Sequence, residues 1–336
     1  MTYYRHLDKR KKTLSNWPHV AATVLLCLIC WAMGYVYSIG FPLSADDTIG
    51  SFWSNASKWL SYQWIVYTLG LLLIILTAFL IQRINDIEML IRERTRLVFM
   101  IFFLLSSTNI GIIPFNNVTF VLLCLVLMIY ELFQTFHLPE AKGKFFNAGV
   151  YIGVASLFMP QMLWFMLLLW IGMYQLLSLN IRSFLASLLG LLTVYWLVLT
   201  WCVWKHDYSM FTLLFNSLTD FHLFSFFLTF RYFHIGFIVI ALLMIPVFFN
   251  IKVDAINNRL RIRQMLSFLL NMTVFSVILI CLYGGNNDAF LAIMYLPLAV
   301  LIAYFLENIR RPFRFSLYYF ILIINVGSFI SRIWKP

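Results

Sequence analysis

The sequence predicts an all-α protein, a polytopic transmembrane helical bundle with about 11 spans (10–12). Three observations predict this class. Of the 336 residues, 62% are hydrophobic and only 11% are charged, against about 25% charged residues in a soluble domain. The mean hydropathy is +0.88. Apolar runs that are long enough to cross about 30 Å of hydrocarbon follow one another along the chain. This composition excludes a water-soluble enzyme, a nucleic-acid-binding domain and a disordered protein.

The first predicted span runs from His19 to Gly40 and follows a basic tail over residues 1–18. Because basic residues stay on the cytoplasmic side, we expect a cytoplasmic N-terminus. The segment is too long for a removed signal peptide and lacks a small-residue cleavage site. The ten further predicted spans are Trp64 to Ile81, Leu97 to Ile113, Val118 to Phe136, Phe145 to Met159, Gln161 to Ser178, Phe184 to Trp204, Phe233 to Phe249, Leu266 to Tyr283, Ala289 to Leu306 and Phe315 to Ile330.

The distribution of charge supports this count. With eleven spans, most of the 24 lysines and arginines fall in cytoplasmic segments, as the positive-inside rule requires. One span more or fewer sends the cluster from Lys252 to Arg263, or the one from Arg83 to Arg96, to the outer side. The basic residues on the outer side are Lys58, Lys205, Arg231, Arg332 and Lys335.

Two stretches leave alternatives open. Phe145 to Met159 and Gln161 to Ser178 are short and meet at Pro160, which fits two short spans or a hairpin that enters the membrane and returns. Tyr208 to Phe230 is apolar but carries polar residues, and a span there would reverse the charge distribution. We therefore expect a single transmembrane domain over 1–336, with a first outer loop at 41–63 and an outer interfacial segment at 205–232.

The sequence lacks the motifs of several chemistries. It contains no phosphate-binding glycine loop, no G-x-S-x-G and no H-E-x-x-H. Cys27 and Cys30 form a C-x-x-C without a second pair or a charged neighbour that would activate a thiol. We interpret these two and the other three cysteines as small apolar side chains within spans. Mid-membrane charge, which ion-coupled transporters use, is almost absent from the predicted spans.

Acidic residues divide into two groups. The cytoplasmic group, which includes Glu88, Glu131 and Glu307, lies among arginines and is interpreted as a solvated, salt-bridging rim. The outer group has few basic neighbours. Its first members, Asp46 and Asp47, precede an amphipathic stretch from Ser51 to Ser61. Two adjacent carboxylates can bind a divalent metal ion, one can act as a general base, and the pair can also simply cap that helix.

A second polar group is predicted on the outer side. Its arginine can bind a phosphate through two hydrogen bonds, and its histidines can orient the phosphate or carry protons. The alternative is an interfacial segment whose polar face stays hydrated. The candidate substrate-binding residues are His206, Asp207, Asp220, His222, Arg231 and His234.

The run Ala148-Gly149-Val150-Tyr151-Ile152-Gly153-Val154-Ala155-Ser156-Leu157 resembles a pattern of GT-C superfamily glycosyltransferases, which use polyprenyl-phosphate-linked sugars. The resemblance implies that an acidic pair in the first outer loop acts as base or metal ligand, a position that Asp46 and Asp47 match. The basic residue that often follows the run is replaced here by Phe158-Met159-Pro160. Small residues at this spacing also serve plain helix packing.

The chain resembles more closely an uncharacterised family of bacterial inner-membrane proteins. The stretch from Phe145 to Trp196 carries this resemblance, as does the Leu296-Pro-Leu-Ala-Val-Leu-Ile-Ala-Tyr-Phe region. It implies a multi-pass protein of the bacterial inner membrane. The long apolar runs predict contact with membrane lipids, and the placement of the basic residues in short clusters between these runs argues against a nucleic-acid partner.

Three functional hypotheses follow. The first is a glycosyltransferase of the cell envelope that uses a lipid-linked sugar on the outer face, with Asp46 and Asp47 as catalytic residues. The second is a non-catalytic membrane subunit or scaffold of an envelope assembly. The third, a transporter or flippase, is weakened by the lack of mid-membrane charge.

Overall fold

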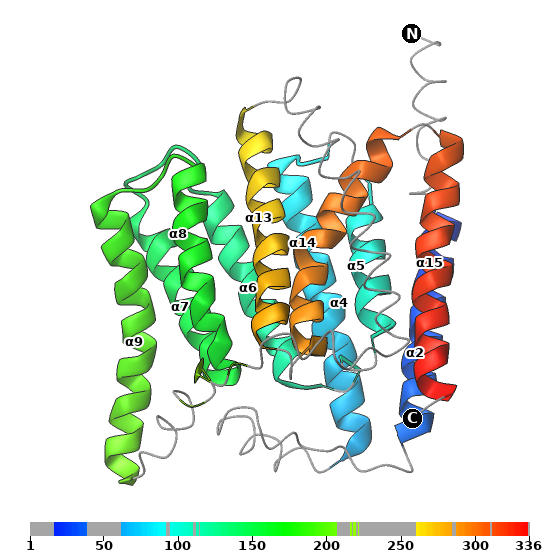
Figure 1. Cartoon of the computed structure of the whole chain (residues 1–336), viewed down its shortest axis with the longest axis horizontal. Coiled ribbons are helices and arrows are strands. Elements are labelled where there is room, and N and C mark those ends of the chain that lie inside the picture. Colours follow the sequence, from blue (N-terminus) through cyan, green and yellow to red (C-terminus); the bar gives the residue numbers. More distant parts are fainter. Residues whose placement is uncertain are drawn as a thin grey trace.

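The fold is a bundle of antiparallel helices (Figure 1). The computed structural model describes residues 17–38, 62–91, 95–109, 112–113, 115–206, 216, 218–219, 221, 260–283, 287–309 and 311–334. Its helices are α2 (Trp17–Ser38), α4 (Gln63–Glu88), α5 (Leu97–Ser107), α6 (Asn117–Phe133), α7 (Lys142–Phe158), the 3₁₀ turn η1 (Pro160–Trp164), α8 (Phe165–Gln175), α9 (Ile181–Lys205), α13 (Leu260–Leu282), α14 (Asn287–Asn308) and α15 (Arg311–Trp334).

The all-α prediction is confirmed for the described residues. Every predicted span except 233–249, which lies outside them, overlaps a helix, although α5 and α8 have only 11 residues each. Six helices are long and apolar enough, by length and composition, to cross a membrane: α2, α4, α9, α13, α14 and α15. The chain is therefore an integral membrane protein of the multi-pass class. The total of eleven spans stays a prediction.

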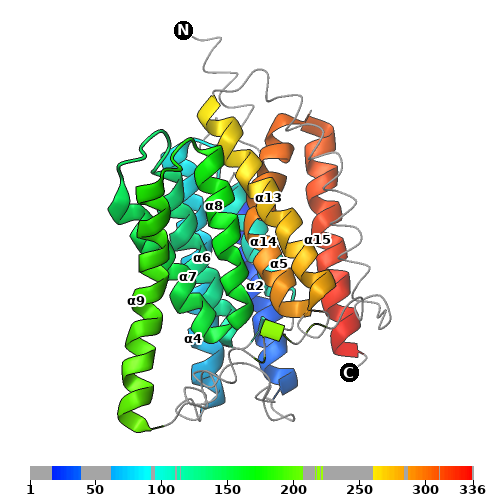
Figure 2. The ribbon, with the colours of Figure 1, turned by 60° about the vertical axis from the view of Figure 1, so that its left-hand side comes forward.

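Successive helices alternate in direction from α2 to α9 and again from α13 to α15 (Figures 1 and 2). The helices α9 and α13 run in the same direction. Residues 222–259, which lie between them in sequence, are outside the described part of the chain. His206 and Leu260 consequently lie at opposite ends of the bundle. A predicted span over 233–249 requires this placement.

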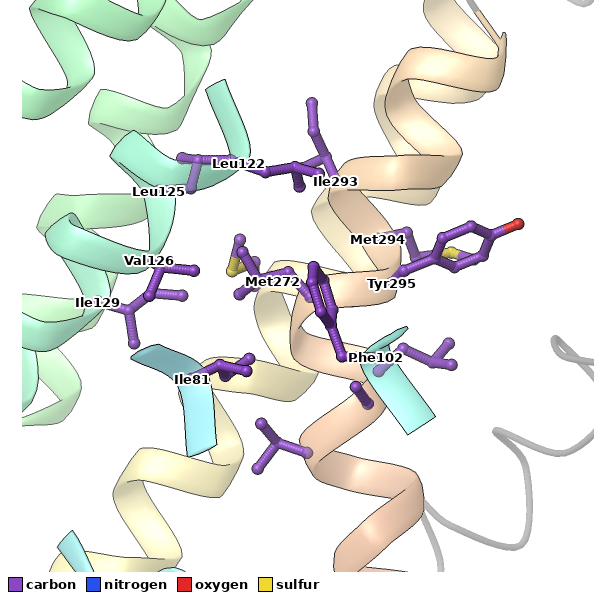
Figure 3. Packing of buried hydrophobic residues seen from close by; sticks show 14 of the residues in the cluster. Ile81, Phe102, Leu122, Leu125, Val126, Ile129, Met272, Ile293, Met294 and Tyr295 are labelled. Carbon is purple, nitrogen blue, oxygen red and sulfur yellow. The ribbon is translucent and has the colours of Figure 1, made fainter. Parts of the chain in front are cut away.

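Helix α14 forms the centre of the bundle, and its membrane-spanning part is buried along its whole length. Figure 3 shows how apolar side chains from four neighbouring helices surround it. Pro297 lies inside this helix, and a proline within a helix removes one backbone hydrogen bond. The labelled side chains around α14 are Ile81 of α4, Phe102 of α5, Leu122, Leu125, Val126 and Ile129 of α6, and Met272 of α13.

The outer helices expose apolar faces. Leu197 and Trp204 of α9, at one edge of the bundle, are 68% and 80% exposed. Water does not stabilise such surfaces, whereas lipid tails do, so this exposure agrees with a membrane environment. At the other edge, α2 and α15 lie side by side (Figure 1), where His19 of α2 contacts the ring of Phe315.

Buried polar side chains join α2, α5 and α15. Trp31 Nε1 donates a hydrogen bond of 3.2 Å to Ser107 Oγ, and Thr108 Oγ1 donates one of 3.5 Å to Asn325 Oδ1. Side-chain hydrogen bonds between helices stabilise membrane bundles because lipid offers no alternative partner. Both contacts lie within the apolar core, so they fix which faces of these helices meet.

Small residues bring α7 and α9 close together. A Cβ atom built on Gly149 would lie 2.0 Å from the carbonyl oxygen of Ser187, and one on Gly190 would lie 2.1 Å from the carbonyl oxygen of Phe146. These positions therefore require glycine for the observed approach of the two backbones. The run that resembles the GT-C pattern thus has a packing role in this structure.

The predicted helical pair around Pro160 is present as α7 and α8, which run antiparallel and are joined through η1 (Figure 2). Proline at the first position of η1 fits this turn because its missing N–H is not needed there. Two short spans and a hairpin that enters the membrane and returns both stay predictions for this pair.

Candidate functional site

The two ends of the bundle differ in charge. Among the lysines and arginines whose side chains the structure describes, all except Lys205 lie at one end, which we call the basic end. This end holds the C-termini of α4, α6, α8 and α14 and the N-termini of α2, α5, α7, α9, α13 and α15. Its described basic residues are Arg83, Arg96, Lys142, Lys144, Arg182, Arg261, Arg263 and Arg314.

The helix ends that flank the predicted functional loops lie at the opposite end. Ser38 ends α2 and Gln63 begins α4, so both attachment points of the first loop lie there. Lys205 ends α9 at the same end, directly before the second predicted polar group. Most predicted site residues lie outside the described part of the chain, namely Asp46, Asp47, Asp207, Asp220, His222, Arg231 and His234.

His206 is the predicted site residue that the structure does describe. It is exposed and follows α9 in the left-handed conformation, with φ of 53°. Its backbone N–H donates to the carbonyl oxygens of Cys202 and Val203 and so closes the last turn of the helix. The neighbouring Lys205 lies 4.9 Å above the ring of Trp201. Such a basic and aromatic pair is typical of a membrane interface.

Tyr283 organises a contact cluster at the opposite end. Its hydroxyl accepts a hydrogen bond of 2.9 Å from Trp164 Nε1 and donates one of 2.7 Å to the carbonyl oxygen of Leu218. Its ring lies 5.1 Å from that of Phe221 and 5.9 Å from that of Phe290, measured between centroids. We call these five residues the Tyr283 cluster. The sequence does not reveal this cluster, because a tyrosine at a span end is normally an interfacial anchor.

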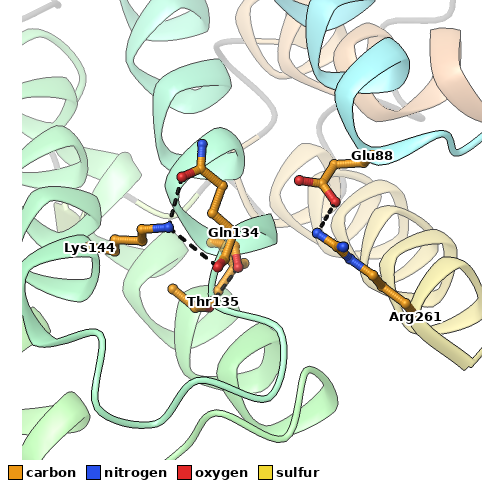
Figure 4. Close-up of polar contacts among 6 residues, drawn as sticks. Glu88, Gln134, Thr135, Lys144 and Arg261 are labelled. Atoms are coloured by element: carbon orange, nitrogen blue, oxygen red, sulfur yellow. Dashed lines mark hydrogen bonds and ion pairs between the residues drawn. The ribbon is translucent and has the colours of Figure 1, made fainter.

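Polar contacts at the basic end join the ends of neighbouring helices, and one of them is remote in sequence (Figure 4). Arg261, at the start of α13, pairs with Glu88, the last residue of α4, and its guanidinium lies 5.8 Å from the centre of the Phe136 ring. Lys144 of α7 donates to Gln134 Oε1, at the end of α6, over 2.8 Å. The contacts connect four helices at one level of the bundle.

The predicted ion pairs of the rim are confirmed for Glu88 and Glu307, but the expectation that these acids are solvated is wrong. The side chain of Glu88 is only 4% exposed. Arg314 pairs with Glu307 at 3.3 Å and also donates to its backbone carbonyl oxygen over 2.7 Å. This arginine therefore caps the C-terminus of α14, whose last carbonyl groups need donors.

The described residues show no arrangement for metal or thiol chemistry. Within the described ranges, no group of three or more His, Cys, Asp or Glu side chains is arranged to hold a metal ion. The five cysteines are free thiols, and four of them are buried, which agrees with their interpretation as small apolar side chains. Cys281 is partly exposed. A metal site at Asp46 and Asp47 stays a prediction.

Comparison with known proteins returned no matching family model, no matching curated protein and no matching solved structure.

Proposed function

We propose that the chain is a GT-C-like glycosyltransferase of the bacterial inner membrane, which takes a sugar from a polyprenyl-phosphate carrier on the outer face. The observation that carries this proposal is the common location of the loop attachment points. The ends of α2, α4 and α9 that flank the predicted catalytic and substrate-binding residues all lie at the end opposite the basic end. The positive-inside rule assigns the basic end to the cytoplasm and the opposite end to the outer face.

The reaction uses the two predicted polar groups together. Asp46 or Asp47, as general base, takes the proton of an acceptor hydroxyl. The acceptor oxygen forms a bond to the anomeric carbon of the sugar, while the bond from that carbon to the carrier phosphate breaks. Polyprenyl phosphate leaves with the electron pair, and Arg231 stabilises its charge through paired hydrogen bonds.

Substitution of both acids tests this function. We expect Asp46→Asn or Asp47→Asn to reduce envelope-glycan synthesis by at least about 100-fold, the usual loss when a general base is removed. The measurement is the glycan profile of cells that carry each variant, with protein level and membrane insertion checked by immunoblot. Asp288→Asn is the matched control, because Asp288 is a carboxylate in the first turn of α14 at the same end of the bundle. Normal glycans in the double variant would remove the enzyme hypothesis.

A second candidate function is a non-catalytic subunit of an envelope assembly. The observation that favours it is the apolar middle of the bundle. Helix α14 is surrounded there by apolar side chains, and the ionisable groups of the described Asp, Glu, Lys and Arg residues lie near the two ends. The same observation disfavours a transporter, which needs a polar path through the membrane. Under this hypothesis the acid variants keep normal glycans, whereas deletion of the whole chain disturbs an envelope assembly.

A further inference from the structure

The Tyr283 cluster connects three parts of the chain that are remote in sequence. Tyr283 directly follows α13 and is 3% exposed. Trp164 ends the turn between α7 and α8, and Phe290 belongs to the first turns of α14. Leu218 and Phe221 belong to the predicted outer segment at 205–232. The cluster is therefore a contact through which Leu218 and Phe221 of that segment meet the helices.

The geometry of the hydroxyl makes this contact directional. The Tyr283 hydroxyl has one proton, which it gives to the Leu218 carbonyl oxygen, and it receives the indole proton of Trp164. A hydroxyl that accepts a hydrogen bond donates more strongly, so the Trp164 indole strengthens the bond to Leu218. Because an indole nitrogen can only donate, the order of the chain Trp164, Tyr283, Leu218 is fixed.

The segment has local order at the point of contact. Thr219 Oγ1 donates to the carbonyl oxygen of Asn216 over 3.1 Å, and the backbone N–H of Phe221 donates to the carbonyl oxygen of Thr219 over 2.9 Å. Ring contacts on Tyr283 and the hydrogen bond to Leu218 hold this turn from two sides. Leu218 and Phe221 are consequently both held against Tyr283.

We propose that Tyr283 is a positioning residue for the outer-face reaction, and that it acts by holding Leu218 and Phe221 against the end of α13, where Trp164 of η1 supports its hydroxyl. This inference rests on the proposed function, in which Asp220 and His222 contact the substrate. Those two residues lie outside the described part of the chain but are next to Phe221 in sequence. Tyr283 itself does not touch the substrate, and its effect passes through the segment.

The variant Tyr283→Phe tests the inference because it removes the hydroxyl and keeps the ring contacts. The probe is a maleimide applied to purified full-length protein with Leu218→Cys, with labelling at position 218 read by peptide mass spectrometry. Loss of one hydrogen bond of about 1 kcal/mol predicts about a 5-fold faster labelling rate at position 218. Trp164→Phe, which removes only the donor to Tyr283, should give a smaller increase.

Two controls separate a local effect from general unfolding. Tyr174→Phe removes a hydroxyl from an exposed tyrosine at the basic end and should leave labelling at position 218 unchanged. Leu138→Cys, at an exposed position of the basic end, should label at the same rate with and without Tyr283→Phe. An unchanged labelling rate at position 218 in Tyr283→Phe overturns the inference.

The glycan profile of Tyr283→Phe cells completes the test. Faster labelling together with reduced glycan synthesis supports the positioning role. Faster labelling with full glycan synthesis overturns that role, and if Asp46→Asn and Asp47→Asn abolish synthesis in the same strain, the proposed function still stands. Normal synthesis in the Asp46 and Asp47 double variant overturns the proposed function itself, and the positioning role with it.

Discussion

The pair formed by Glu88 and Arg261 illustrates how one residue contact determines the arrangement of the basic end. The acid is nearly fully buried, whereas the side chain of the arginine is 47% exposed. The loss of the acid and the loss of the arginine should therefore have different effects on stability. Removing the arginine leaves a buried charge without its partner, but removing the charge of the acid leaves an arginine that water can still solvate.

This asymmetry gives a prediction for stability. We expect Arg261→Gln to lower the free energy of unfolding by about 3 kcal/mol, because Glu88 then carries an uncompensated buried charge. Glu88→Gln should cost only about 1 kcal/mol, the value of one hydrogen bond. The free energies are measured by denaturant titration of the purified protein in mild detergent. Arg263→Gln, an exposed position on the same helix, is the control and should have little effect. Equal losses in the two variants would contradict the asymmetry.

The sequence predicted the kind of contact at this position but not its partners. The placement of Glu88 among arginines indicated ion pairs, and the structure contains one. The partner, Arg261, is 173 residues away in the chain, and no local pattern identifies it. Burial of the acid was also missed, because solvation depends on which helix ends meet. The same reason explains why Tyr283 resembled an ordinary interfacial tyrosine.

At the scale of helices, the glycines of α7 and α9 account for the closest backbone approach described above. The spacing of Gly149 and Gly153 in the sequence indicated either a glycosyltransferase pattern or helix packing, and the structure supports the packing role. The sequence did not reveal that the facing helix is α9, since Gly190 lies outside the run. A pattern of small residues predicts a packing face but not its partner.

Gly149→Ala should separate α7 from α9. Its new methyl group would lie 2.0 Å from the Ser187 carbonyl oxygen, so the helices must move apart, at a cost of about 1–3 kcal/mol for overpacking. The midpoint of thermal unfolding in detergent measures the loss. Gly327→Ala is the matched control in α15, because nothing lies within 4 Å of a Cβ atom there. If the two variants behave alike, the close approach does not contribute to stability.

At the scale of the whole molecule, the predicted and observed features agree in their charge distribution. The eleven-span prediction places Arg83, Lys144 and Arg261 on one side, and the structure places all three at the basic end. The long apolar runs are sufficient to predict this charge distribution, because their order and direction follow from the sequence. The arrangement of the helices around α14 does not follow from the sequence, because every run is apolar and any of them is a plausible central helix.

The orientation of the bundle in the membrane decides whether the proposed reaction is possible. We expect the basic end in the cytoplasm, which places exposed Glu140, in the turn between α6 and α7, inside the cell and exposed His206 outside. A cysteine at position 206 should then react with a membrane-impermeant maleimide added to intact spheroplasts. A cysteine at position 140 should react only after permeabilisation.

The reverse labelling pattern would assign the opposite end to the cytoplasm. The first loop would then be cytoplasmic, because its attachment points at Ser38 and Gln63 lie at the same end as His206. Asp46 and Asp47 could not then act on an outer-face carrier, and the glycosyltransferase proposal would fail without any measurement of activity. Labelling of both cysteines in intact spheroplasts would contradict the antiparallel arrangement, since α7, α8 and α9 together connect the two positions.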